Sequence, residues 1–354
     1  MQITAAVVES SHADWRLEQL ELAEPAADEV VVRIAASGIC QTDVHGRDDY
    51  FGIAFPCVFG HEGAGTVERV GAAVRKVKPG ERVVMTSPSC GACVACLRGL
   101  PGYCASARRI KFGGRLRDGR APFHRNGSPV SGAFFQQSSF ATHALATEGN
   151  VVKVPPDVPL RVAAAFACGV NTGAGAVFNV LRPQPGSSIA VFGVGAVGLA
   201  AVMAARIAGC ARIEVFDRHQ NRLRLARELG AAATRGAKDF QYSVEAAGDP
   251  AALRQALECL APLGACCLVG SARKGTEVAL EMAFLQQGRT LRGCIQGDAP
   301  ADTFLPALFE HYRAGRMPVD RLITEYEFAE VNRAVADSVA GRTVKPVLRI
   351  GSDL

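Results

Sequence analysis

Four cysteines lie within residues 90–104 at the spacing C-x2-C-x2-C-x7-C: Cys90, Cys93, Cys96 and Cys104. Short C-x2-C turns bring thiolates close enough to share one tetrahedral metal ion, and four sulfur ligands suit zinc. Because four cysteines leave no open coordination position, the metal is expected to be structural rather than catalytic. By ligand type alone, an iron–sulfur cluster is the alternative.

A glycine-rich turn is the second pattern with chemical content. It joins an apolar strand expected over residues 188–192 to an alanine-rich helix expected over 199–209, and a further strand ends at Asp217. Strand, G-x-G-x-x-G, helix, strand and acid together are the fingerprint of a dinucleotide-binding βαβ unit. The fingerprint glycines are Gly193, Gly195 and Gly198.

Each member of this fingerprint has a physical task. Gly193 permits the tight turn, Gly195 lets a pyrophosphate approach the backbone, and Gly198 lets helix and strand pack closely. The pyrophosphate then meets the positive end of the helix. Asp217 would accept hydrogen bonds from both ribose hydroxyls and repel a 2′-phosphate, so NAD is favoured over NADP. Arg218, directly after it, weakens that preference.

The chain resembles the zinc-dependent medium-chain alcohol dehydrogenases over nearly its whole length. The segments that carry the resemblance stand in the family's order: Gly38-Ile-Cys40-Gln-Thr42-Asp43-Val-His45, Gly60-His61-Glu62-Gly63, the four-cysteine segment, Ala167-Cys168-Gly169-Val-Asn-Thr172-Gly173 and the glycine turn. Residues 134–142 and 169–177 are similar to the aryl (benzyl-type) branch. The resemblance implies an α/β fold with two domains. A GroES-like, β-rich catalytic domain would comprise residues 1–169 plus 296–354, and a Rossmann NAD-binding domain, a doubly wound parallel sheet, residues 170–295.

The resemblance also implies roles for matching positions. Cys40, His61 and Cys168 would hold a catalytic zinc with one open position, the Cys2His ligand set known from alcohol dehydrogenases. Glu62 would lie behind the metal, and Asp43 would accept a hydrogen bond from His61 and raise its basicity. The remaining roles are a proton relay (Thr42 and His45), contacts flanking the nicotinamide (Thr172, Val197 and Val269), a place near the adenosine ribose (Arg222) and a contact with the pyrophosphate (Lys345).

The implied cofactors are therefore two zinc ions per chain and NAD. Zinc would act as a Lewis acid on the oxygen of a small-molecule alcohol, and the proton would leave through Thr42, the cofactor ribose and His45. A hydride would then pass to NAD+, and the reverse reaction would reduce an aldehyde. A primary aromatic or allylic alcohol is the substrate class that the branch implies. Pocket candidates by position are Phe51, Phe55, Thr86 and Ile295.

The chain departs from the family pattern in two places. Residues 231–239 lead almost directly to residues 240–248, where the family has a further strand and helix. About one αβ unit of the doubly wound sheet is therefore expected to be missing, which would expose a sheet edge. Gln41 stands where several relatives carry an arginine facing the pyrophosphate, so NAD should bind somewhat less tightly.

Length, composition and charge limit the classes of protein to which the chain can belong. With 354 residues, 49% hydrophobic and 21% charged, the chain is long enough for two domains and is not disordered in bulk. A net charge of +5 does not indicate a nucleic-acid partner. We expect a cytoplasmic protein without a membrane partner, because no secretory signal is recognisable and the apolar stretch over 189–205 is better explained by the glycine turn. Homodimers or homotetramers are the family's expectation.

Two other functions stay open on the sequence. One is a formaldehyde dehydrogenase acting on a glutathione or thiol adduct, since residues 108–125 carry seven basic side chains against one acid and could attract an anionic adduct. The other is a catalytically impaired cofactor-binding relative that lost turnover with the missing αβ unit.

Overall fold

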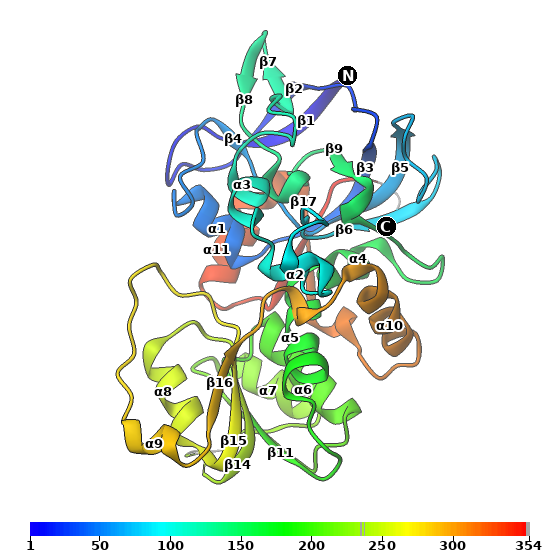
Figure 1. Ribbon diagram of the computed structural model, residues 1–354. Coiled ribbons are helices and arrows are strands. Elements are labelled where there is room, and N and C mark those ends of the chain that lie inside the picture. Colours follow the sequence, from blue (N-terminus) through cyan, green and yellow to red (C-terminus); the bar gives the residue numbers. More distant parts are fainter. Residues whose placement is uncertain (234–235, 237, 352–354) are drawn as a thin grey trace. The chain divides into compact units, whose positions relative to one another are not determined.

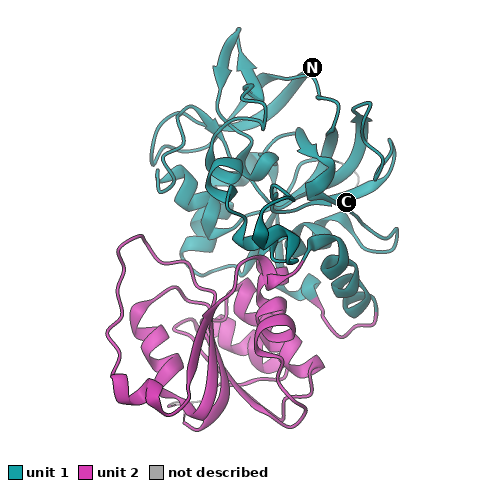
Figure 2. Cartoon of the chain, in the orientation of Figure 1, with its two compact units in different colours: residues 1–168, 300–313, 319–354 teal, residues 169–299, 314–318 magenta. Residues whose placement is uncertain are grey.

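The computed structural model describes residues 1–233, 236 and 238–351, and they form two compact units (Figures 1 and 2). Unit 1 contains Met1–Cys168, Pro300–Arg313 and Val319–Leu354, and unit 2 contains Gly169–Ala299 and Ala314–Pro318. The chain thus leaves unit 1 after Cys168 and returns to it at Pro300, where the sequence placed these boundaries after residue 169 and at residue 296.

Unit 1 is built on two sheets. The five-stranded sheet has the order β4-β1-β2-β7-β8, with strands Cys57–Val58, Gln2–Val8, Arg16–Leu22, Phe123–Arg125 and Ser128–Val130. The seven-stranded sheet has the order β10-β6-β5-β3-β18-β17, with strands Val151–Lys153, Arg82–Met85, Gly63–Val70, Glu29–Gly38, Lys345–Arg349 and Ile323–Glu327, and β9 (His143–Thr147) pairs with β3.

Strand β3 shows how the sequence sets this architecture. Its residues Val30, Val32 and Ile34 pack into one hydrophobic cluster, whereas Val31 packs into another. Successive side chains of a strand point to opposite faces, so an unbroken apolar run indicates a strand buried on both faces. Strand β18, from the end of the chain, pairs antiparallel with the last residues of β3, which places Lys345 beside the segment that carries Cys40.

The helices of unit 1 are short and connect or cover the sheets: α1 (Gln41–Arg47), α2 (Val94–Leu97), α3 (Ala107–Phe112), α4 (Leu160–Ala165), α10 (Ala301–Arg313) and α11 (Val331–Val339). Short 3₁₀ or π segments are η1 (Pro101–Tyr103), η2 (Phe134–Gln136), η3 (Glu148–Asn150), η4 (Phe166–Val170), η7 (Val319–Leu322) and η8 (Phe328–Glu330).

Unit 2 is a parallel six-stranded sheet with the order β13-β12-β11-β14-β15-β16. Its strands are Ala232–Ala233, Arg212–Phe216, Ser188–Phe192, Phe240–Glu245, Leu260–Leu268 and Thr290–Gly293. Its helices are α5 (Asn171–Gly175), α6 (Ala196–Ile207), α7 (Gln220–Glu228), α8 (Pro250–Glu258) and α9 (Met282–Gln286), with η5 (Ala176–Leu181) and η6 (Gln296–Asp298). In chain order the strands run 3-2-1-4-5-6, the doubly wound arrangement that binds dinucleotides.

The expectation of a missing αβ unit is wrong about the strand. The strand is present as β13, which is reduced to two residues and pairs with Glu214 and Val215 of β12. The described residues between β13 and β14 hold no helix, and residues 234, 235 and 237 lie outside the described part of the chain. The shortened connection therefore keeps the sheet order, and among the described residues β13 pairs with β12 at Glu214 and Val215.

One helix of the described residues, Leu160–Leu181, is long and apolar enough to cross a membrane. Its most apolar window is 72% buried, as in the core helix of a folded domain. The apolar stretch over 189–205 is divided between β11, the glycine turn and α6.

Candidate metal centres and cofactor site

The first candidate site begins at helix α1. Cys40 is the residue before the helix, and its backbone N–H donates to Oδ2 of Asp43 (2.9 Å). A side chain in the first turn that accepts from the residue before the helix is half of a capping box, so helix capping fixes the position of Asp43. This capping leaves the other oxygen of the carboxylate free to act elsewhere.

That second oxygen orients His61. Oδ1 of Asp43 lies 2.8 Å from Nδ1 of His61 and also accepts the N–H of Gly60 (3.1 Å). Both side chains are buried, and Nε2 of His61 has no hydrogen-bond partner in the described part of the chain. A buried nitrogen without a partner, on a ring whose other nitrogen is held by a carboxylate, is the arrangement of a metal-ligating histidine.

Cys168 completes the group from the π-helical turn η4 (Phe166–Val170). One ligand atom from each of Cys40, His61, Glu62 and Cys168 lies within 4.8 Å of all the others. The cluster joins residues that are far apart in the sequence, as the resemblance implied. Two sulfurs and one imidazole fit a zinc ion with an open fourth position, and the buried oxygen Oε1 of Glu62 has no hydrogen-bond partner in the residues described.

The pKa values of the side chains in this cluster are shifted in different directions. Interaction with the Cys168 thiol, followed by His61, holds the pKa of Cys40 well below its usual range against the effect of burial. The same pairing, together with burial, raises the pKa of Cys168. Burial would lower the pKa of His61, but the Asp43 carboxylate, with help from Cys40, raises it to about 10. A metal must therefore displace protons from this site, which couples its affinity to pH.

Lys345 lies behind the cluster. Its side chain is 2% exposed, and its ammonium pairs with Oε2 of Glu62 and donates to the carbonyl oxygen of Ile39 (3.3 Å). The physical reason is the pairing of β18 with β3, which draws the side chain into the interior behind the cluster. Lys345 is thus the buried partner of Glu62, and its contact with the pyrophosphate stays a prediction. Burial raises the pKa of Glu62 to about 7, while the Lys345 charge opposes that shift.

The relay residues lie on the same short helix. Thr42 and His45 are three residues apart on α1, so their side chains share a face. The thiol of Cys40 lies 3.6 Å from Oγ1 of Thr42, and the His45 ring stacks on Tyr50 with ring centroids 5.1 Å apart. One end of the expected relay therefore touches a member of the cluster.

Gln137, which the sequence did not indicate as a site residue, holds the segment around His61 in place. Gln137 is buried; its Oε1 accepts the N–H of Gly63 (3.1 Å) and its Nε2 donates to the carbonyl of His61 (3.0 Å). The available signal was the polar run Gln136-Gln137-Ser138-Ser139 between apolar residues, because buried polar residues generally have a bonding task.

An aromatic wall, also not predicted, stands next to His61. The Phe135 ring stacks on the imidazole with centroids 4.6 Å apart, and the Phe134 ring meets it edge-on at 5.7 Å. Phe112 and Phe51 extend the wall, stacked on each other at 4.0 Å. Of the pocket candidates in unit 1, Phe51 belongs to this wall, Phe55 meets Phe59 edge-on, and Thr86 is buried.

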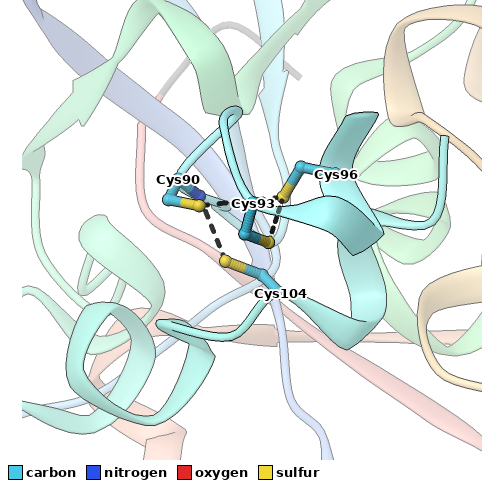
Figure 3. A group of neighbouring side chains, drawn as sticks. All are labelled: Cys90, Cys93, Cys96 and Cys104. Carbon is cyan, nitrogen blue, oxygen red and sulfur yellow. Dashed lines mark hydrogen bonds between the residues drawn. The ribbon is translucent and has the colours of Figure 1, made fainter. Parts of the chain in front are cut away.

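The second candidate metal site is the group of four cysteines (Figure 3). One sulfur from each lies within 4.8 Å of all the others, and all four are unpaired thiols. Backbone N–H groups of Cys90 and Ala105 point at the sulfurs of Cys104 (3.3 Å) and Cys93 (3.4 Å). The Ala105 N–H, with that of Cys96, lowers the pKa of Cys93 to about 6, whereas burial raises that of Cys96 to about 11. The loop is thus preformed for a closed tetrahedral ion.

The glycine turn opens onto a cavity of about 780 Å³ within unit 2. Gly193, Gly195, Asp217 and Arg222 are among its lining residues. Asp217 holds the turn through Oδ2, which accepts the N–H of Val194 (2.8 Å), and caps the next segment through Oδ1. A Cβ on Gly198 would lie 1.9 Å from the carbonyl oxygen of Gly193, so the close approach of helix and strand requires glycine there.

The three residues expected at the nicotinamide lie outside the lining of that cavity but near one another in unit 2. A Cβ on Gly173 would touch the carbonyl oxygen of Val197, so Thr172 sits where α5 packs on α6. Cys294 connects this point to the end of β15, since its N–H donates to Leu268 (3.0 Å) and its thiol lies 3.9 Å from the Thr172 carbonyl oxygen. Val269 is the residue directly after Leu268, at the end of β15.

Comparison with known proteins gives a consistent result. Residues 26–156 match the alcohol dehydrogenase GroES-like domain, and residues 196–310 match the zinc-binding dehydrogenase domain. The chain is 40% identical to geraniol dehydrogenase of Castellaniella defragrans, covering 97% of this chain and 96% of that protein. Benzyl alcohol dehydrogenase of Acinetobacter calcoaceticus superposes with a TM-score of 0.95 at 36% identity, covering 99% and 100% of the two chains. An alcohol dehydrogenase zinc-binding domain protein from Burkholderia ambifaria superposes with a TM-score of 0.96 at 41% identity, with the same coverage.

Proposed function

The chain belongs to the zinc-dependent medium-chain alcohol dehydrogenase family, in its aryl-type branch, and on that premise we propose that it oxidises a primary aromatic or allylic alcohol to the aldehyde with NAD+ as hydride acceptor, reversibly. The observation that carries the proposal is the cluster of Cys40, His61 and Cys168, with Nε2 of His61 buried and without a partner in the described chain. Two thiolates and one imidazole are the ligand set of a catalytic zinc, whose fourth position would take a substrate oxygen.

The chain's own residues prepare this chemistry. Asp43 fixes the tautomer of His61, so that Nε2 carries the lone pair that a metal needs. Lys345 neutralises Glu62 behind the cluster, which limits the negative charge that Glu62 adds to the two thiolates. Thr42 and His45 would carry the alcohol proton outward. A bound zinc supplies Lewis acidity toward the alcohol oxygen, and a bound nicotinamide supplies the hydride acceptor.

The preference for NAD rests on Asp217. Its carboxylate lines the cavity at the end of β12, where the ribose of a dinucleotide lies in this fold. A carboxylate accepts hydrogen bonds from ribose hydroxyls and repels a 2′-phosphate. Arg218 and His219 also line the cavity and moderate that repulsion.

The substrate class rests on the aromatic wall. Phe134 and Phe135 contact the ring of His61 directly, so an alcohol held at the cluster would place its carbon skeleton near π-faces. Aromatic and allylic groups gain both buried apolar area and ring contacts there. The geraniol and benzyl alcohol dehydrogenases among the relatives have names of this class.

The thiol-adduct alternative finds less support. Arg125 pairs with Glu9 and Glu18, and Arg120 pairs with Asp118 and Glu29. Four carboxylates of the chain therefore neutralise part of the positive charge of this segment, which leaves less of it to attract an anionic adduct.

A homo-oligomer is part of the proposal. Strand β16 pairs only with β15 among the described strands, and all four of its residues are exposed. Leu291 on β16 and Met282 on α9 are 40% and 81% exposed. An open, apolar strand edge is stabilised by pairing with a second copy. Light scattering after gel filtration tests this, and a monomer at micromolar concentration would contradict it.

The deciding experiment is NADH formation from NAD+ and benzyl alcohol or geraniol by zinc-loaded protein. Cys40→Ser should abolish turnover, because the three-ligand cluster loses a thiolate. Cys210→Ser is the matched control, since Cys210 is in neither cysteine group. Turnover that survives Cys40→Ser, or silence of the wild-type protein across a panel of alcohols and aldehydes, overturns the proposal. Faster turnover with NADP+ overturns its NAD part alone.

A further inference from the structure

Lys111 is a buried lysine without a polar partner. It lies in helix α3 (Ala107–Phe112) and is 5% exposed. Its ammonium nitrogen makes no hydrogen bond or ion pair with any residue that the structure describes, and its nearest recorded contact is the face of the Phe135 ring, 5.5 Å from the centroid. A ring face attracts a cation, but it does not accept its three N–H groups as oxygen atoms do.

The place of Lys111 connects it to the three-ligand cluster. The Phe135 ring that it contacts is the ring stacked on His61, with centroids 4.6 Å apart and planes 27° apart. The two distances together place the ammonium nitrogen within about 10 Å of the His61 ring. All three residues belong to unit 1. The cation is therefore separated by a single aromatic ring from the cluster at which an alcohol oxygen would be held.

A second buried lysine, Lys345, shows which hydrogen-bond and ion-pair partners Lys111 lacks among the described residues. Lys345 is 2% exposed, against 5% for Lys111, and it has both a carboxylate partner, Glu62, and a carbonyl acceptor, Ile39. Burying an ammonium without such partners is costly, and buried charges are as a rule paired. Burial lowers the pKa of Lys111, as expected for an ammonium taken out of water.

We propose that Lys111 is a specificity-determining residue that binds an anionic substituent of the alcohol, so that the favoured substrates are aryl alcohols carrying a carboxylate or similar group. This inference rests on the proposed function and refines its substrate class. In a para-substituted ring, the alcohol oxygen lies at the cluster and the anion lies one ring length away along the Phe135 wall. A charge-assisted hydrogen bond formed there would replace the missing partner of Lys111.

The test compares two alcohols on zinc-loaded enzyme with NAD+. These are 4-(hydroxymethyl)benzoate and its neutral methyl ester, with benzyl alcohol as the reference for basal activity. Wild-type enzyme should favour the carboxylate over the ester in kcat/KM, mainly through KM. Lys111→Met should lower kcat/KM for the carboxylate by about 10- to 100-fold, the range of one charge-assisted hydrogen bond, and should change that for benzyl alcohol by less than about 3-fold.

Two further variants serve as controls. Lys111→Arg keeps the charge and should retain most of the preference for the carboxylate. Lys78→Met removes an exposed lysine of the same unit and should change nothing. Inhibition by benzoate gives a readout independent of turnover, and its inhibition constant should rise in Lys111→Met by a similar factor.

The outcomes are distinct. If benzyl alcohol is oxidised but the wild-type enzyme shows no preference for the carboxylate, the inference fails and the proposed function stands. If Lys111→Met lowers activity on both alcohols equally and also lowers zinc content, Lys111 is a counter-charge for the thiolates, and the inference is again overturned. If benzyl alcohol and every other alcohol stay unreacted, the proposed function itself has failed.

Discussion

Asp43→Asn is the substitution that most directly tests the reasoning about the catalytic cluster. The Asp43 carboxylate accepts three N–H groups while fully buried: from Cys40 (2.9 Å), Gly60 (3.1 Å) and His61 (2.8 Å). Asparagine has nearly the same shape but keeps one acceptor oxygen. Turned to serve Gly60 and His61, its amide would direct N–H groups at the N–H of Cys40.

The size of the effect follows from these contacts. The hydrogen bond from Cys40 is replaced by two N–H groups that face each other. The hydrogen bonds from Gly60 and His61 remain, but their acceptor is no longer charged. Charge-assisted bonds contribute roughly twice as much as neutral ones, and an unsatisfied buried donor costs about 1–3 kcal/mol. The free energy of unfolding of the metal-free protein should therefore fall by about 2–4 kcal/mol. Zinc affinity at the three-ligand cluster should fall about 10- to 100-fold, the usual effect of removing a group that orients a ligand.

The assay separates the two effects. Urea unfolding of metal-free protein measures stability, and competition with a chelator measures zinc affinity. The four-cysteine group does not contact Asp43 and serves as an internal reference, so zinc content should fall at one site and persist at the other. Asp48→Asn is the matched control, since Asp48 ends the same helix but pairs with Arg47 and His12 at the surface.

One result would refute this reasoning. If Asp43→Asn binds zinc at the three-ligand cluster as tightly as the wild-type protein, Asp43 does not orient His61 for a metal. A loss of stability without a loss of zinc affinity would leave Asp43 as a helix-capping residue alone.

Three further predictions follow from other parts of the structure. Gly198→Ala should destabilise the protein by about 1–3 kcal/mol, because its Cβ would lie 1.9 Å from the Gly193 carbonyl oxygen; an unchanged melting temperature would contradict this. Asp217→Ala should lower kcat/KM with NAD+ by about 10-fold or more relative to NADP+, and equal losses would show that the carboxylate only braces Val194. The four-cysteine group should lose zinc as pH falls: Cys93, whose pKa is about 6, is a thiolate above that pH and binds a competing proton below it. Chelator competition should therefore show a steeper pH dependence below about 6, and an affinity that does not vary with pH would be evidence against a thiolate site.

The sequence was most informative where chemistry is local. The spacing of Cys90, Cys93, Cys96 and Cys104 predicted one closed group because a short loop limits how far its sulfurs can separate, and the structure brings all four together. The glycine turn is equally local, since each glycine is required by a contact within one βαβ unit. The doubly wound order of unit 2 and the return of the chain end to unit 1 agree with the family resemblance.

Only the tertiary structure shows which residues that are distant in the sequence come together and which side chains are buried. Cys40, His61 and Cys168 meet only because a helix cap, a strand end and a π-helical turn converge; their spacing alone gave no reason to join them. The burial of Lys345 against Glu62 could not be predicted, because an isolated lysine in a sequence gives no indication of its depth; strand pairing carries it inside.

The shortened segment before β14 shows the same division. Its length was plain in the sequence, but whether a strand survived there depended on pairing with β12, and the two-residue strand β13 remained. Lys111 was visible in the sequence only as one of the seven basic residues over 108–125, and nothing there indicated that it is buried against Phe135. The sequence by itself determined the family, the four-cysteine group and the glycine turn, since these depend on short-range spacing. Burial and long-range pairing, which depend on the whole fold, decided the rest.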